Sequence, residues 1–141
     1  MAQHVPKRWS INAVSSADRP LAFFREGLPL VPVAGTDVSP VEYLMIAAAA
    51  CFALSVRSVL TARGLPKIFF EVIVTGEKAR DLPSRLDQIS LVALFNGAID
   101  EVQAEAIAAD AKKLCTVTNT LIGAPRLDVR ARRAAAFPNT G

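Results

Sequence analysis

The segment SPVEYLMIAAAACFALSVRSVLTARG, residues 39–64, decides how this chain folds. Ser39 is a favourable N-cap residue, and Pro40 suits the first helical position, where its missing N–H costs nothing. Glu42 stands where the acid of a capping box can reach back to the cap. Gly64 ends the segment and Pro66 follows two residues later. The sequence therefore predicts one long helix, from about Pro40 to Arg63.

The middle of this predicted helix is apolar on almost every side, from Tyr43 to Leu54. A helix of that kind is normally surrounded by other parts of a protein. We therefore expect it to lie buried at the centre of the fold. One small sheet cannot cover every side of a helix. The helix could therefore be buried in part by a second copy of the chain in a dimer. The apolar run is shorter than the roughly 18 residues that a membrane span needs, so no membrane insertion is expected.

The segments on either side of this helix predict a sheet and a second helix. Alternating, β-branched and aromatic residues predict strands at residues 8–14, 21–24, 67–76, 87–95 and 126–132. Prolines at 28–38 favour an extended or looped segment there. Asp100 as cap and Gln103 at the box position predict a helix that ends near Leu114. This order predicts an α+β fold whose sheet packs against two helices on one side.

The whole chain has the composition of one compact domain. It has 141 residues, of which 52% are hydrophobic and 21% charged, enough for a real core. We expect a single domain over 1–141, with its core at about 10–132 and a polar tail at 133–141. The chain has a net charge of +3, but no nucleic-acid-binding motif accompanies its basic residues. We therefore expect a solvated basic edge and no nucleic-acid partner. The N-terminus lacks the apolar core of a secretory signal, which favours the cytoplasm.

The rare residue types exclude several kinds of catalytic site. The chain has one histidine, His4, in a terminal segment, and two cysteines far apart in sequence. These cannot make a zinc site of familiar spacing, and a Ser-His-Asp or Cys-His arrangement would depend on His4. The seven glycines are scattered, so no phosphate-binding loop is expected. We therefore expect no metal or cofactor, and thiol chemistry remains.

The two cysteines, Cys51 and Cys115, each admit two interpretations. Taken alone, either is more simply a small apolar residue packed in the core. Together they could form a peroxide-reducing pair, in which one thiolate attacks the O–O bond and the other condenses with the resulting sulfenic acid. That chemistry needs only that the two Cα atoms come within about 7 Å. With 63 residues between the cysteines and no secretory signal, a structural disulfide is not expected.

Three segments carry a resemblance to a known family. The helix start leading to AAAAC in residues 39–64, the strands around EVIVTGEKA and LDQISLVALF, and the later AKKLCTVTNTL occur in a characteristic order. In this the chain resembles the OsmC/Ohr family of osmotically inducible and organic hydroperoxide resistance proteins, and is closest to its OsmC-like branch. The resemblance covers about residues 10–132.

The resemblance implies an OsmC-like fold, with antiparallel sheets packed around two main helices, in an intertwined homodimer with active sites at the interface. It also implies roles for both cysteines. In peroxidase members of such a family, the first cysteine, here Cys51, attacks the peroxide and the second, here Cys115, resolves it. Such members reduce organic hydroperoxides to alcohols and are recycled by dithiols, notably lipoyl groups carried on proteins.

One position departs from the pattern of those peroxidases. They place an acid directly after the helix-opening proline, where it orients an arginine toward the thiolate, whereas this chain has Val41 there and Glu42 one residue later. At 100° per residue Glu42 lies about 180° around the helix from Cys51, so it is a candidate catalytic partner and more simply a cap. For the arginine, Arg19 and Arg25 are candidates, with Arg25 preferred.

Three functions remain open on the sequence. The leading hypothesis is a cofactor-free thiol peroxidase of the oxidative stress response that acts on organic hydroperoxides, with Cys51 peroxidatic and Cys115 resolving. The second is a non-catalytic protein that binds an apolar small molecule in a cleft at the dimer interface, and the valine at position 41 favours it. The third is another thiol-based role, such as redox sensing or sulfur handling.

Overall fold

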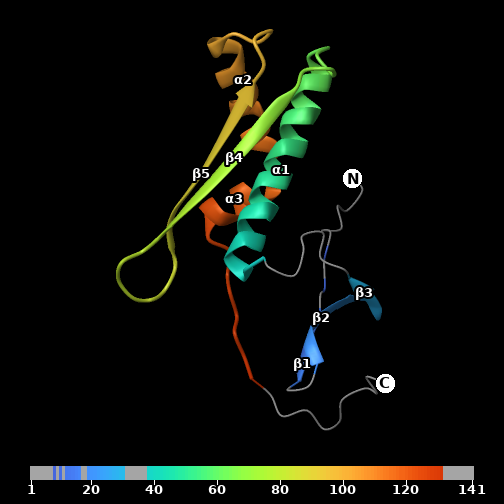
Figure 1. The fold of residues 1–141 in the computed structure, drawn as a ribbon, viewed down its shortest axis with the longest axis vertical. Helices are drawn as coiled ribbons and strands as arrows, with labels where there is room; N and C mark the ends of the chain where they lie inside the picture. The colour runs from blue at the N-terminus through green and yellow to red at the C-terminus, as the bar shows by residue number, and fades with distance from the viewer. Residues whose placement is uncertain (1–7, 9, 11, 17–18, 31–37, 132–141) are drawn as a thin grey trace, which may run out of the picture. The chain divides into compact units, whose positions relative to one another are not determined.

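The computed structural model describes residues 8, 10, 12–16, 19–30 and 38–131 (Figure 1). These residues belong to two compact units, which meet in sequence between Val38 and Ser39 and are described separately.

The first unit is a small antiparallel sheet. Its strands are β1 (Asn12–Ser16), β2 (Arg19–Arg25) and β3 (Leu28–Leu30), in the order β1-β2-β3. Glu26 and Gly27 both have positive φ angles, 52° and 77°, as a two-residue hairpin turn requires. The first two strands were predicted within a few residues. β3 lies in a segment predicted to be extended or looped, and Pro29 is tolerated in it because β3 is an edge strand.

The second unit begins with the predicted long helix, α1 (Pro40–Ala62). Both hydrogen bonds of its capping box are present, and Arg63 forms the C-cap. Helix α1 runs alongside a long hairpin made of β4 (Phe70–Lys78) and β5 (Leu86–Phe95), as Figure 1 shows. The two strands are antiparallel throughout, with Ile73 opposite Val92 near their middle.

Two further helices complete this unit. Helix α2 (Glu101–Leu114) has the predicted Asp100 cap, and its capping box is closed by Gln103. Helix α3 (Thr116–Gly123) follows almost at once, with Cys115 as the single residue between the two helices. The sequence analysis missed α3. The strand predicted at 126–132 is also wrong for the described residues up to 131, which have no regular structure and pair with no described strand.

The core of the second unit lies where the helices meet one face of the hairpin. Its buried residues come from α1, α2 and the α2–α3 junction: Phe52, Val56, Val59, Leu60, Ile107, Ala111 and Cys115. Alternate residues of the strands pack against them, including Phe70, Val72, Leu91, Ala93 and Phe95. Helices α1 and α2 therefore pack on one side of the β4–β5 sheet, as predicted.

Helix α1 is only partly covered by this core. It has the length and mean hydropathy, 1.9 over 18 residues, of a membrane-spanning helix, and 33% of that window is buried. A core helix of a soluble protein meets the same criteria, and α1 supplies four residues of the buried cluster. Its exposed large apolar residues are Val41, Leu44, Ile46 and Leu54.

Candidate thiol site

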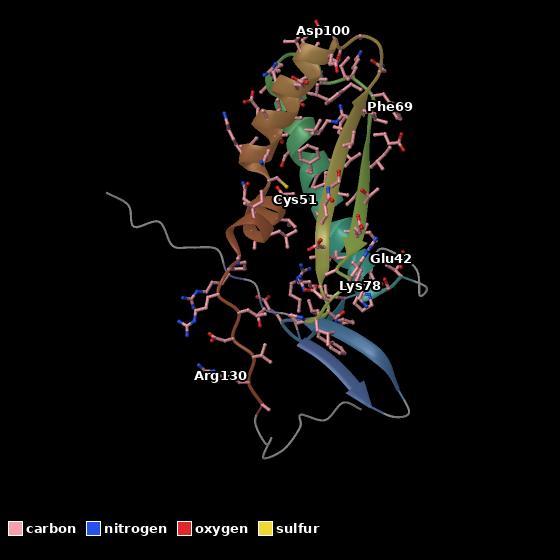
Figure 2. The ribbon with its side chains drawn as sticks, turned by 90° about the vertical axis from the view of Figure 1, so that its left-hand side faces the viewer. Glu42, Cys51, Phe69, Lys78, Asp100 and Arg130 are labelled. Carbon is pink, nitrogen blue, oxygen red and sulfur yellow. The ribbon has the colours of Figure 1, made fainter. Side chains whose placement is uncertain are left out.

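The fold brings the two cysteines together. Cys51 lies midway along α1 (Figure 2), and Cys115 lies between α2 and α3. The Cys115 side chain is fully buried in the core, and the partly exposed Cys51 packs against that core with its thiol close to the Cys115 sulfur. Both thiols are free. Two thiols in contact can be oxidised to one disulfide with little movement of the backbone.

Helix α3 creates a favourable position for a thiolate at Cys115. This residue is the N-cap of α3, where the first N–H groups of a helix have no partner within it. Burial raises the pKa of the Cys115 thiol, but the nearby Thr118 hydroxyl and N–H, the Cys51 thiol and the Val117 N–H lower it. The result is a pKa below the ordinary value of a cysteine.

Thr118 is a buried polar residue beside this sulfur, and its side chain is 8% exposed. Its hydroxyl faces two acceptors, the Cys115 sulfur and the Cys115 carbonyl oxygen, the latter at 3.3 Å. One hydroxyl proton cannot serve both acceptors fully. Since a charged acceptor attracts a donor more strongly than a carbonyl does, the proton should turn to the sulfur whenever Cys115 is ionised.

The serines that share the helical stripe of Cys51 are used within α1. Ser55 donates its hydroxyl to the Cys51 carbonyl oxygen at 2.9 Å, and Ser58 donates to the Leu54 carbonyl oxygen at 3.1 Å. Both bonds are of the i to i−4 type that short hydroxyl side chains form within helices. The two hydroxyls therefore donate their hydrogen bonds to backbone carbonyl oxygens and not to the Cys51 thiol.

Arg57 of α1 and Arg63, the C-cap of that helix, are also engaged away from the cysteine pair. Arg57 donates to the carbonyl oxygens of Pro66 and Ile68, at 2.9 and 3.0 Å, and stacks over the Phe70 ring. Arg63 forms an ion pair with Asp110 at 2.9 Å. The two arginines proposed from the sequence, Arg19 and Arg25, lie on β2 in the first unit, so their role as activators of Cys51 stays a prediction.

Glu42 fulfils the capping role that the sequence predicts. Its backbone N–H donates to the Ser39 hydroxyl oxygen and its carboxylate accepts from the Ser39 N–H, both at 3.2 Å. The pKa of Glu42 is lowered by the side-chain hydroxyl of Ser39 and then by its N–H. Glu42 is near the start of α1, well before Cys51 (Figure 2). Its second predicted role, in catalysis, stays a prediction.

Replacing Glu42 with glutamine separates these two roles. Because the folded pKa is lowered, the carboxylate stabilises the fold fully above its unfolded value near 4.5, and this stability is lost as the pH falls through the folded pKa. We expect Glu42→Gln to be slightly less stable at pH 7, with the difference vanishing at acid pH in thermal melts. The rate of Cys51 oxidation should not change. A slower rate without loss of stability would assign Glu42 to catalysis.

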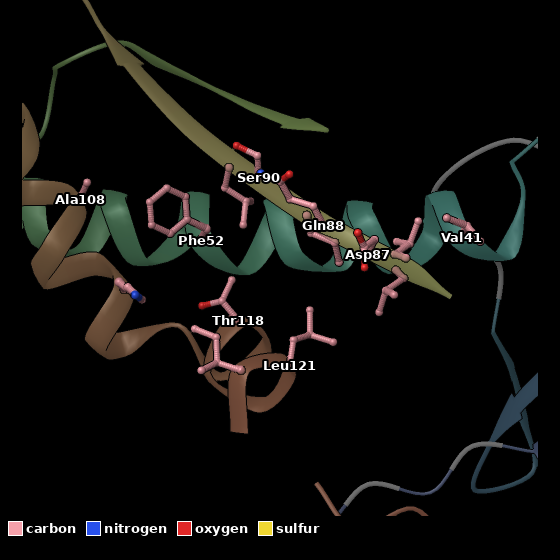
Figure 3. A pocket seen from close by; sticks show the side chains of 14 residues that line it. Val41, Phe52, Asp87, Gln88, Ser90, Ala108, Thr118 and Leu121 are labelled. Atoms are coloured by element: carbon pink, nitrogen blue, oxygen red, sulfur yellow. The ribbon is translucent and has the colours of Figure 1, made fainter. Parts of the chain in front are cut away.

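An open apolar cleft of about 940 Å³ lies between α1, β5, α2 and α3 (Figure 3). Along α1 it runs from Val41 to Phe52, with Thr118 and Leu121 of α3 on the opposite wall (Figure 3). Its lining includes Phe52, which follows Cys51 in the chain, and Thr118, which lies beside Cys115, so the cleft adjoins the segments that carry the thiols. The cleft could hold the apolar part of a ligand close to sulfur.

The structure adds two features that sequence reasoning missed. The first is Val41, which forms part of an apolar wall where an acid was the expected residue type. The second is Thr118, which with the start of α3 stabilises the Cys115 thiolate. The small polar residues after Cys115 were visible in the sequence, and the capping preference of such residues could have suggested a helix start there.

Comparisons with known proteins agree on one family. The model of the family described as OsmC-like protein matches residues 34–130. No curated protein matches the chain.

Solved structures share the same fold at low sequence identity. An OsmC-like protein from Mycoplasma pneumoniae is 20% identical, with a TM-score of 0.66 over 85% of this chain and 91% of that one. The organic hydroperoxide resistance protein OhrB of Bacillus subtilis is 17% identical, with a TM-score of 0.57 over 81% and 90%. An organic hydroperoxide resistance protein OsmC from Legionella pneumophila is 20% identical, with a TM-score of 0.60 over 85% and 93%. The α+β fold of the OsmC-like type is thereby confirmed.

Proposed function

Because the chain belongs to the OsmC-like family, in which a role in peroxide resistance or redox chemistry is supported, we propose that it is a thiol peroxidase that reduces organic hydroperoxides. The observation that carries this proposal is the contact between Cys51 and Cys115, the two cysteines of the chain. The names of the similar proteins from Bacillus subtilis and Legionella pneumophila support the substrate class.

The proposed reaction uses each sulfur once. The Cys51 thiolate attacks the terminal peroxide oxygen and breaks the O–O bond; the alkoxide takes a proton and leaves as an alcohol, and Cys51 becomes a sulfenic acid. The Cys115 thiolate then attacks the Cys51 sulfur and expels hydroxide, which is protonated to water. The product is a Cys51–Cys115 disulfide. A dithiol, such as a lipoyl group carried on a protein, would return both sulfurs to thiols. We place this cycle in the cytoplasm, where reductants keep free thiols available.

The cleft supplies the apolar surroundings that such a substrate needs. Its aliphatic and aromatic side chains could hold the alkyl part of a hydroperoxide while the peroxide group reaches Cys51. The same cleft also favours the second candidate function, a non-catalytic protein that binds an apolar small molecule. In that case both cysteines are packing residues, and a hydroperoxide should react with them no faster than with an ordinary thiol.

The two functions are distinguished by stopped-flow measurement of thiol loss in the reduced protein. The peroxidase predicts that one equivalent of an alkyl hydroperoxide, such as cumene hydroperoxide, removes both thiols quickly and lowers the mass by two hydrogens. An equal dose of hydrogen peroxide should act more slowly, because it lacks an apolar part to bind in the cleft. Slow oxidation with both peroxides would reject the peroxidase and leave the binding protein.

We also propose that the protein forms a homodimer in which a second copy covers the open face of α1. Exposed apolar side chains along this helix, of which Leu54 is 70% exposed, form a surface that monomers seldom leave open. Sedimentation at micromolar concentration should therefore show a dimer. Leu54→Lys should shift the protein toward monomer, whereas Leu82→Lys, in the loop between β4 and β5, should not. A wild-type monomer would contradict the proposal.

A further inference from the structure

The two sulfurs of the pair have different surroundings. Cys115 is fully buried by residues of its own chain, whereas the Cys51 side chain is partly exposed. A second copy of the chain can add cover but cannot remove it, so Cys115 stays buried in any assembly. An external molecule therefore reaches Cys51 first. The start of α3 and Thr118 stand on the buried side, against the Cys115 sulfur.

In thiol–disulfide exchange, the difference in burial between Cys51 and Cys115 decides which sulfur a reductant attacks. The attacking thiolate must approach one sulfur along the line of the S–S bond, from the side opposite the leaving sulfur. Cys115 is fully buried in the core cluster at the start of α3, which leaves no open approach to its sulfur. The leaving sulfur departs as a thiolate, and departure is faster when that thiolate is well stabilised.

We infer that the disulfide is reduced in one direction only: the reductant attacks the Cys51 sulfur and expels Cys115, whose thiolate lies at the start of α3 beside the Thr118 hydroxyl. The inference rests on the proposed function, because it assumes that the Cys51–Cys115 disulfide forms. Thr118 acts as a positioning residue, because its effect is exerted through the Cys115 sulfur beside it.

The reaction is balanced in two steps. In the first, a thiolate of the reductant forms a bond to the Cys51 sulfur, the Cys51–Cys115 bond breaks, and its electron pair leaves on Cys115. In the second, the other thiol of the reductant, as its thiolate, attacks the reductant's own bound sulfur and releases Cys51 as a thiolate. The reductant ends as a disulfide, two electrons have passed to the protein, and the two protons of the reductant become available to the cysteines.

The direction can be read from a trapped mixed disulfide. The protein is oxidised with diamide, and the intramolecular disulfide is verified by mass. It is then treated with 2-mercaptoethanol, a monothiol that cannot complete the second step, and quenched at short times with acid. After alkylation with N-ethylmaleimide, tryptic mapping separates Cys51 from Cys115, because Arg57 and Lys113 lie between them. We expect the mercaptoethanol adduct on Cys51 and the maleimide on Cys115.

Each outcome of this experiment has a separate meaning. An adduct on Cys115, or equal adducts on both cysteines, overturns the inference and leaves the peroxidase intact. Failure of diamide to form the intramolecular disulfide rejects the proposed function, and the inference with it. An adduct on Cys51 alone supports both.

Thr118→Val tests the positioning role, because valine matches the shape of threonine and lacks its hydroxyl. We expect it to slow adduct formation about three- to tenfold, the size of effect expected for one hydrogen bond to a charged leaving group. In a Cys51→Ser background it should also raise the pH at which the Cys115 thiolate absorbance appears. Thr118→Ser, which restores a hydroxyl, should recover both properties.

Thr120→Val is the matched control. Thr120 is on the same helix, and its hydroxyl donates to the Thr116 carbonyl oxygen at 2.7 Å. Its removal should leave the adduct rate and the Cys115 titration unchanged. Equal effects of Thr118→Val and Thr120→Val, or no effect of Thr118→Val, would overturn the role of Thr118.

Discussion

Cys51→Ser should lower the rate of organic hydroperoxide reduction by about 10³-fold or more, because a serine hydroxyl stays protonated and cannot attack the O–O bond as a thiolate does. Cys115 would remain, fully buried and without access to the peroxide. The measurement is steady-state peroxide consumption with a dithiol reductant, together with the thiol count of the protein after one equivalent of peroxide.

The paired variant, Cys115→Ser, should behave differently. Its Cys51 still attacks, so the first turnover should proceed within about tenfold of the wild-type rate, but the sulfenic acid has no thiol to condense with. A sulfenic-acid reagent such as dimedone should therefore label Cys51 in this variant and label the wild type much less.

A serine substitution at a neighbouring site controls for damage to α1. Ala53 lies on α1 and is partly buried, as Cys51 is, so Ala53→Ser introduces the same hydroxyl and removes no thiol. We expect near-normal activity from it. If Cys51→Ser kept its activity while Cys115→Ser lost it, the roles of the two cysteines would be reversed. If both variants matched the wild type, thiol catalysis would be wrong.

Ile107→Ala should lower the free energy of unfolding by about 3 kcal/mol, the central value for removing a large aliphatic side chain from a core. Ile107 is fully buried between α1, α2 and the hairpin, in the same cluster as Cys115. The substitution leaves a cavity that neighbouring elements can close only in part. Urea denaturation followed by circular dichroism gives the change as a shift of the midpoint at constant slope.

Val102→Ala is the matched control on the same helix. Val102 is 77% exposed, so its truncation removes little buried surface, and alanine favours a helix more than valine does. We expect a change within about 0.5 kcal/mol. Equal destabilisation by the two substitutions would contradict the burial of Ile107. If Ile107→Ala unfolds outright, the milder Ile107→Val should still cost about 1 kcal/mol.

Local signals in the sequence determined the elements of the second unit. The caps of α1 and α2 were predicted because a cap depends on residues within one helical turn, such as Ser39 with Glu42 and Asp100 with Gln103. The strands β4 and β5 were predicted from alternating, β-branched and aromatic residues within each strand. In these cases the interacting groups are neighbours in the chain.

Other features depend on contacts between distant segments. The strand expected at 126–132 had the right alternation, but a strand also needs a partner, and none of the described residues pairs with 126–131. Helix α3 was missed because its segment is short and rich in threonine, a residue with low helix propensity. Because α3 was missed, the position of Val117 and Thr118 beside the Cys115 thiol was not predicted and is visible only in the fold.

The sequence by itself determined that this protein has two thiols, a long capped apolar helix and the order of segments found in one family. Only the tertiary structure decided that Cys51 and Cys115 touch, that one is buried and the other partly open, and that the start of α3 contacts the buried sulfur. The physical reason is that reactivity here depends on burial and on donor groups from other elements. The burial of Cys115 and the donor groups near it are established only when α1, α2 and α3 pack together.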